Sequence, residues 1–283
     1  APKPVRLRGS KRSKCTRKQG FRVLWGCTLA AALALTGCGR GGAPGSSGAG
    51  SMSGSGSGAM SGGTAGQEQA WRTGLGVVTE AAGSDRAGKI TTAAAAVVLD
   101  ADGKLADVML DELELSVSGG STGSVTTPED VRSKRTKGED YPLAAASSLG
   151  KGWAEQADRF ADYLTGRTPD EVKKLKTDEN GQPQDADLVS GCTIAVDRYR
   201  DAVVRACEQA KALGAAQGDR VTLSLIAADL PQNLAATDDQ DAHVRADITL
   251  AALTVDSNGR VTSAIGDMTQ PPLTVSADGT VSG

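Results

Sequence analysis

The chain has 283 residues, with 31 lysine and arginine residues against 34 aspartate and glutamate residues. Its length allows one large domain or two small ones. Nine of the basic residues lie within residues 1–22, and the rest of the chain, with 22 basic and 34 acidic residues, has a formal charge of −12. This acidity argues against nucleic acid as a partner, because lysine and arginine must neutralise the phosphates.

The N-terminal segment has the layout of an export signal. The basic residues 1–22 are followed by the 13-residue apolar run VLWGCTLAAALAL, at 23–35, which is too short to cross a bilayer core that needs about 20 residues. The next residues, Leu-Thr-Gly-Cys at 35–38, resemble a bacterial lipobox, which implies lipidation of Cys38. The alternative is an ordinary signal peptide with an incidental cysteine. We expect a lipoprotein signal peptide at 1–37 and a membrane-anchored, extracytoplasmic protein.

Residues 38–66 are expected to form a flexible tether. Residues 39–66 contain 12 glycines and seven serines, too little apolar surface to offset the entropy of ordering. Beyond the tether the cysteines are Cys192 and Cys207. We expect no disulfide between them, because a helix predicted from Asp197 carries Cys207 too far away.

A β-hairpin is predicted at the start of the folded part. The sequence AAAAVVLDADGKLADVML, at 93–110, places Asp100 and Gly103 between two apolar runs. In the next stretch leucine and valine alternate with Glu112, Glu114 and Ser116, which predicts a strand with one wet face and one buried face.

A similar hairpin pattern returns 156 positions later. The sequence ADITLAALTVDSNGRVTSAIGD, at 246–267, aligns Asp256 with Asp100 and Gly259 with Gly103. We interpret this as an internal duplication of a β-rich unit, the alternative being two unrelated hairpins that share turn chemistry. The first unit, with the helices that follow it, is expected at 67–214, and a partial second copy at 215–283.

Three helices are predicted between the two hairpins. Apolar residues at spacings of three and four favour one helical stretch from Pro142 to Gly166. The sequence TPDE, at 168–171, is a capping box that starts a short second helix. A third helix is predicted from Asp197 to Gly214. The predicted fold class is therefore α+β, with a hairpin-based sheet packed against helices.

The stretch DLVSGCT, at 187–193, joins the helical region to the third helix. It resembles the flavin-attachment signature of the FMN-binding domain family, in which the threonine of a Ser-Gly-Ala-Thr run is linked to FMN by a phosphodiester bond. The order of hairpin, helix, threonine motif and helix is also similar over residues 72–214. The resemblance implies FMN as a covalent cofactor at Thr193, with Asp187, Ser190 and Gly191 as further cofactor-binding residues.

The chemistry of these residues limits how such a flavin is attached. A threonine hydroxyl is a weak nucleophile by itself, so a separate flavin transferase is needed. The small residues Ser190 and Gly191 give that enzyme, or another backbone, close access.

This chain departs from the family pattern at Cys192, in place of alanine, and at Ala195 and Val196, in place of small hydroxyl residues. The implied role is an electron carrier between redox partners.

Other interpretations of the chain remain open. The motif is alternatively a turn that feeds a helix, in a non-flavinylated envelope lipoprotein that acts as a binding or scaffold module. The basic cluster of Arg132, Lys134, Arg135 and Lys137 then faces an anionic ligand or lipid headgroups, or forms a solvated loop. His243, the single histidine, is expected to be solvated, and we identify no metal site and no catalytic constellation. An electron-transfer or binding protein is therefore favoured over an enzyme.

Overall fold

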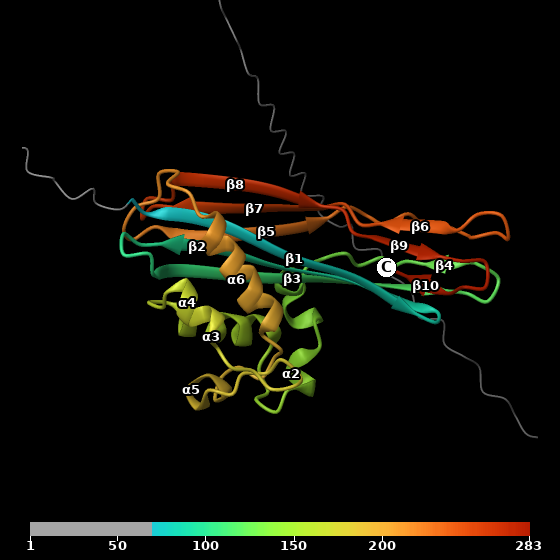
Figure 1. The fold of residues 1–283 in the computed structure, drawn as a ribbon, viewed down its shortest axis with the longest axis horizontal. Helices are drawn as coiled ribbons and strands as arrows, with labels where there is room; N and C mark the ends of the chain where they lie inside the picture. Colours follow the sequence, from blue (N-terminus) through green and yellow to red (C-terminus); the bar gives the residue numbers. More distant parts are fainter. Residues whose placement is uncertain (1–69) are drawn as a thin grey trace, which may run out of the picture. The chain divides into compact units, whose positions relative to one another are not determined.

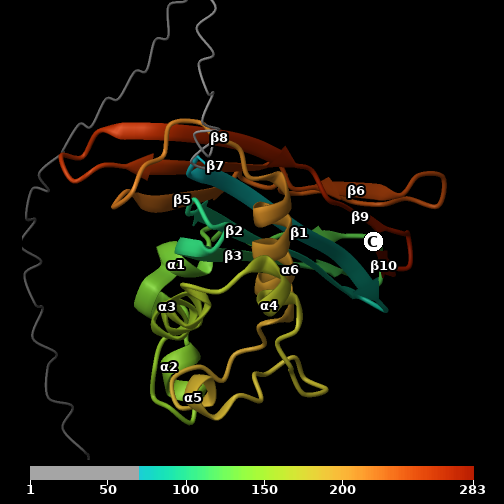
Figure 2. The ribbon, with the colours of Figure 1, turned by 60° about the vertical axis from the view of Figure 1, so that its left-hand side comes forward.

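The computed structural model describes residues 70–283, so the predicted signal peptide, Cys38 and the tether lie outside the described residues. The described part has an α+β architecture of antiparallel sheets packed with helices, which confirms the predicted fold class. A central sheet has the helices on one face and two C-terminal sheets on the other (Figure 1, Figure 2). No helix in residues 70–283 is both long and apolar enough to span a membrane.

The central sheet is an antiparallel meander in the order β1-β2-β3-β4. Its strands are β1 (Arg72–Ser84), β2 (Ala87–Leu99), β3 (Leu105–Gly119) and β4 (Val125–Thr126). Strand β2 is buried on both faces: Ala94, Ala96 and Val98 face the C-terminal sheets, while Ala93 and Ala95 face the helices. This explains the continuous apolar run at 93–99, because a strand buried on both faces has no exposed positions for polar residues.

The helical layer consists of short helices around two longer ones. Its elements are α1 (Lys134–Lys137), η1 (Gly138–Asp140), α2 (Leu143–Ala146), α3 (Trp153–Leu164), α4 (Pro169–Lys173), α5 (Ala186–Val189) and α6 (Asp197–Gln209). The predicted capping box at α4 is confirmed, since the Thr168 backbone N–H donates to Glu171 Oε2 at 2.7 Å and the Glu171 N–H donates to Thr168 Oγ1 at 3.4 Å.

Two predicted helix boundaries were wrong. The stretch from Pro142 onward is not continuous but is divided into α2 and α3, because Gly150, at φ 64°, has a left-handed backbone that a helix cannot contain. The third helix ends at Gln209 rather than near Gly214, because Lys211 forms a β-bridge with Thr73. The helix therefore stops where the chain joins the central sheet.

The C-terminal part forms two further antiparallel sheets. One has the order β5-β7-β8, and the other has the order β10-β9-β6. Their strands are β5 (Arg220–Ala227), β6 (Ala242–Arg245), β7 (Ile248–Val255), β8 (Val261–Thr269), β9 (Pro272–Val275) and β10 (Val281–Ser282). Their inward side chains share one hydrophobic core with the central sheet, so residues 215–283 pack on the first unit.

The two hairpins match in detail, as an internal duplication predicts. In the first, Gly103 N–H donates to Asp100 O at 3.1 Å, and in the second Gly259 N–H donates to Asp256 O at 3.0 Å. Both glycines have positive φ, 79° and 75°. Both ladders also shift register at the equivalent point, between residues 98 and 99 and between residues 254 and 255. The same turn and the same bulge thus occur 156 positions apart.

Candidate functional site

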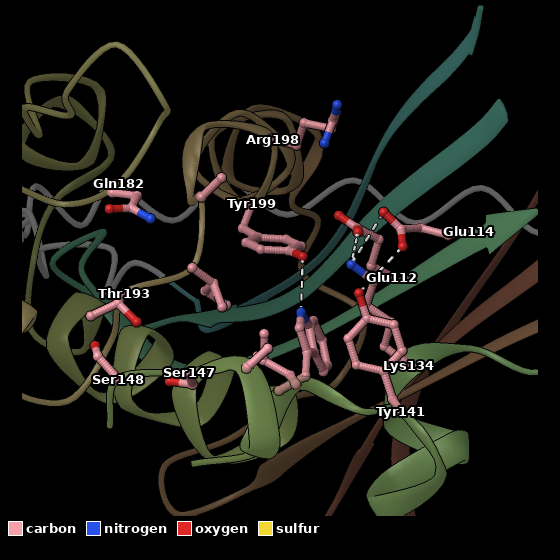
Figure 3. Close-up of a pocket in the computed structure, with 15 residues that line it drawn as sticks. Glu112, Glu114, Lys134, Tyr141, Ser147, Ser148, Gln182, Thr193, Arg198 and Tyr199 are labelled. Carbon is pink, nitrogen blue, oxygen red and sulfur yellow. Dashed lines mark hydrogen bonds and ion pairs between the residues drawn. The ribbon is translucent and has the colours of Figure 1, made fainter. Parts of the chain in front are cut away.

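A cavity of about 550 Å³ lies between the central sheet and the helical layer, and Thr193 is among its lining residues. Thr193 and Ser148 lie on one side of the cavity, and Glu112, Glu114 and Lys134 lie on the other (Figure 3). The cavity therefore joins the predicted attachment residue to a charged wall that the motif did not indicate.

A buried glutamine on α3 fixes the position of Thr193. Both the backbone N–H and the Oγ1 hydroxyl of Thr193 donate to Gln156 Oε1, at 2.9 and 3.1 Å. The Gln156 amide nitrogen donates to Ser147 Oγ and to Lys151 O, each at 3.0 Å. Gln156 has no exposed surface, whereas Thr193 is partly exposed. One amide side chain thus connects the threonine loop to the loop before α3 at the cavity rim.

The other predicted site residues lie outside the cavity lining. Asp187 and Ser190 are exposed, and the Ser190 hydroxyl donates to Asp187 O at 2.8 Å. This is the local backbone bonding expected of a turn. Gly191 is buried, and a Cβ there would lie 2.8 Å from the Arg159 side chain. The glycine therefore accommodates an arginine side chain rather than another backbone. The structure brings Thr193 alone, of the four residues, to the cavity.

Cys192 points into the core of the helical layer and has no exposed surface. Both Cys192 and Cys207 are buried free thiols, as expected. Burial raises the pKa of Cys192 to about 11 and that of Cys207 to about 12. Cysteine at position 192 thus fills the space of a small apolar residue, and its thiol lies in the core rather than at the cavity.

We expect both thiols to resist alkylation in the folded protein. The thiolate is the reactive form, and raised pKa values together with burial keep both groups protonated at pH 8. Iodoacetamide treatment followed by peptide mass spectrometry should find residues 192 and 207 unmodified in buffer and modified in denaturant. Rapid labelling of Cys192 in buffer would contradict this packing and would show that the threonine loop opens.

The charged wall is a buried ion network. Lys134 Nζ lies 2.5 Å from Glu112 Oε1 and 3.3 Å from Glu114 Oε1, and Lys89 Nζ lies 2.7 Å from Glu114 Oε1. The side chains of Lys134 and Glu112 are 9% and 3% exposed. Burial lowers the pKa of Lys134, but the charges of the two glutamates outweigh it and raise that pKa above 10.5. The lysine thus remains charged beside the cavity.

Aromatic side chains complete the cavity. Trp153 and Tyr199 meet edge to face with ring centroids 5.8 Å apart, and Trp153 Nε1 donates to Tyr199 Oη at 3.1 Å. Burial and the nearby Glu112 charge raise the pKa of Tyr199 well above 10, so its phenol is neutral. Tyr141 donates to Glu114 Oε2 at 3.3 Å. Trp153 is 2% exposed, so it belongs to the core, and it also lines the cavity.

Two predictions from local sequence are corrected here. The cluster at 132–137 is not a solvated loop: it includes α1, and Lys134 is buried. Its Arg132 and Arg135 pair with aspartates of the chain. Glu112 was expected on a wet strand face but is 2% exposed, because Lys134 covers it.

His243 is exposed, as expected, although it lies in strand β6. Within residues 70–283 no group of three or more His, Cys, Asp or Glu side chains is placed to hold a metal.

Gln156 and Glu112 are site residues that the sequence did not indicate, and Lys134 was noted only as part of the basic cluster at 132–137. The sequence signal for Gln156 is its position three residues after Trp153 and four residues before Phe160, on the apolar side of a predicted helix. Scans against protein-family models, curated proteins and solved structures find no match. The resemblance to the FMN-binding domain family therefore depends on the DLVSGCT motif and the order of the elements alone.

Proposed function

We propose that this chain is a lipid-anchored extracytoplasmic electron carrier with FMN attached covalently to Thr193. The observation that carries the proposal is the position of the Thr193 side chain at the rim of a cavity of about 550 Å³. Cavities of about 300–1,000 Å³ are typical for small organic ligands. The hydroxyl donates to Gln156, and Thr193 as a residue is partly exposed, which suits modification by a transferase.

The residues around the cavity have the chemistry that a flavin nucleotide requires. The donors that line the cavity together with Thr193 include the hydroxyls of Ser147 and Ser148, which suit a phosphate. Arg198 also lines the cavity, but its Nε donates to Glu80 at 2.8 Å. Tyr141, which is partly exposed, supplies aromatic surface for a ring system. Lys134 offsets part of the charge of the two glutamates. When bound, FMN supplies one- and two-electron chemistry, and the protein supplies its position and environment.

The test is co-expression of the full chain with a flavin transferase. We expect a band with flavin fluorescence after denaturing electrophoresis, because an ester-linked flavin survives unfolding. Thr193→Ala should lose the band completely, whereas Ser190→Ala, which removes an exposed hydroxyl outside the cavity, should keep it. A fluorescent band that persists in Thr193→Ala contradicts the proposed attachment site, and a chain that stays dark beside a modified control flavoprotein contradicts the cofactor.

A second candidate is a binding module that takes a small ligand in the same cavity without covalent flavin. The observation in its favour is that the Thr193 hydroxyl and N–H both donate to Gln156, so the threonine has a structural role of its own. The carboxylates of Glu112 and Glu114 in the cavity wall also favour a ligand with hydrogen-bond donors or a positive charge over an anionic ligand. This candidate is favoured if the co-expressed chain shows no flavin fluorescence and its Tm rises when such a ligand is added.

A further inference from the structure

The sheet of β5, β7 and β8 has an outer face that no element of residues 70–283 covers. Side chains alternate along a strand, so the positions next to the inward core residues point outward. Ile226 and Met268 there are 63% and 60% exposed, among the most exposed large apolar side chains of the described chain. We call this the outer face, and its central residues are Ile226, Thr249, Ala251, Leu253, Val255 and Met268.

If the two hairpins are copies of one unit, as we interpret them, the outer face has an equivalent in the first unit. A shift of 156 positions aligns Ala93, Ala95 and Val97 of β2 with residues 249, 251 and 253 of β7. In the first unit these β2 residues belong to the core beneath α3 and α6. The side of the sheet that helices cover in the first unit is thus open in the second. Figure 2 shows the helices on the far side of the central sheet from β5, β7 and β8.

The outer face is also unusual in charge. Its register positions on the three strands contain one charged residue, Arg220, and no acidic residue. The rest of the chain beyond residue 22 has a formal charge of −12. Two copies of such a protein repel each other, and the repulsion is weakest where neither surface carries a carboxylate. A partly apolar surface without carboxylates is compatible with its own copy in a two-fold arrangement.

We propose that the outer face is a self-association surface, on which a second copy of this chain packs sheet against sheet. The first unit already packs in this way on the inner face of the same sheet. Strands of eight or nine residues at about 3.3 Å per residue, three of them about 4.8 Å apart, give a patch on the order of 400 Å² per copy. The total of about 800 Å² is below the roughly 1,000 Å² that a stable interface buries, so the dimer is weak and transient in dilute solution. Tethering of both copies to one membrane raises their effective concentration and favours the dimer. This step rests on the proposed lipidation of Cys38.

The test uses the full lipidated chain in lipid vesicles with a cysteine placed in the outer face. Ala251 lies in the middle of the central strand, near the expected two-fold axis, so Ala251→Cys should be joined to its copy by a bismaleimide that spans about 10 Å, the usual spacing of packed sheets. Cys192 and Cys207 are buried and should not react. Mass spectrometry of the dimer band should identify the peptide of residue 251 linked to itself.

The matched variants add two acidic residues to each copy. Ile226→Asp and Met268→Asp both change exposed positions. In the double variant the cross-linked fraction should fall about tenfold, because the dimer would bury four carboxylates, two from each copy, without cations or hydrogen-bond donors to pair with them. Ala144→Asp with Ala145→Asp, which adds the same charge to exposed positions of α2, should leave it unchanged. Circular dichroism checks that each variant is folded. The proposal is overturned if no dimer forms at any protein-to-lipid ratio, if the dimer survives the outer-face aspartates, or if residue 251 is linked to another protein instead.

Discussion

Gly76→Val is expected to lower the free energy of unfolding by about 3 kcal/mol or more, because overpacking at a rigid contact cannot be relieved by side-chain movement. A Cβ at Gly76 would overlap the carbonyl oxygen of Ala202 and the backbone nitrogen of Ala206, both on α6. Ala202 and Ala206 are themselves fully buried. The helix and strand β1 therefore touch backbone to backbone, and a valine forces α6 away from the sheet.

The effect should reach the cavity as well as stability. The first turn of α6 carries Arg198 and Tyr199 into the cavity wall, so a displaced helix also moves these side chains. Thermal unfolding followed by circular dichroism should show a decrease in Tm of roughly 10 °C, the shift expected for 3 kcal/mol in a domain of this size. The matched control is Gly266→Val in β8, where a Cβ would lie 3.8 Å from Leu250 O. Equal losses in the two variants would show that the close approach of α6 is not the cause.

The same contact illustrates how much of the fold follows from sequence. The hairpin turns at Asp100 and Asp256 and the capping box at Thr168 are local, so each motif contains most of the atoms that stabilise it. The apolar run of β2 likewise reports burial on both faces. By contrast, the role of Gly76 depends on a helix more than 120 residues later in the chain, and no short pattern contains that information.

The candidate site divides in the same way. The motif at 187–193 placed Thr193 correctly at the end of a loop before a helix, and the structure adds that this loop borders a cavity. Lys134 was assigned to a solvated segment because its neighbours are charged, yet tertiary packing places it over Glu112. Gln156 lies within an amphipathic helix, and its polarity is explained only by the loop that it holds. The sequence motif thus indicated Thr193, the proposed attachment residue, while the partners that define its surroundings come from strands and helices distant in the chain.

Lys134→Met is expected to be the most destabilising single change in the cavity wall. It leaves the carboxylate of Glu112, which is 3% exposed, without its cation, and breaking a buried ion pair from one side costs about 3–5 kcal/mol. Adding Glu112→Gln to the same chain should recover much of this loss, because the stranded charge is then gone. The matched control is Lys173→Met, which breaks an exposed ion pair with Glu208 and should cost at most about 1 kcal/mol.

The pH dependence gives this prediction a second, independent readout. Burial raises the pKa of Glu114, but the hydrogen bond from Lys89 and the charge of Lys134 outweigh it and hold that pKa below 4.5. The contribution of Glu114 to the stability of the folded state is therefore present above pH 4.5 and is lost as the pH falls through the folded pKa. The folded pKa of Lys134 lies above 10.5, so its stabilisation is present below pH 10.5 and is lost as the pH rises through the folded value. The difference in unfolding free energy between wild type and Lys134→Met should therefore be largest between these limits and narrow on both sides. A difference that stays constant from pH 3 to pH 11 would mean that Lys134 stabilises the wall by packing its alkyl chain and not by its charge.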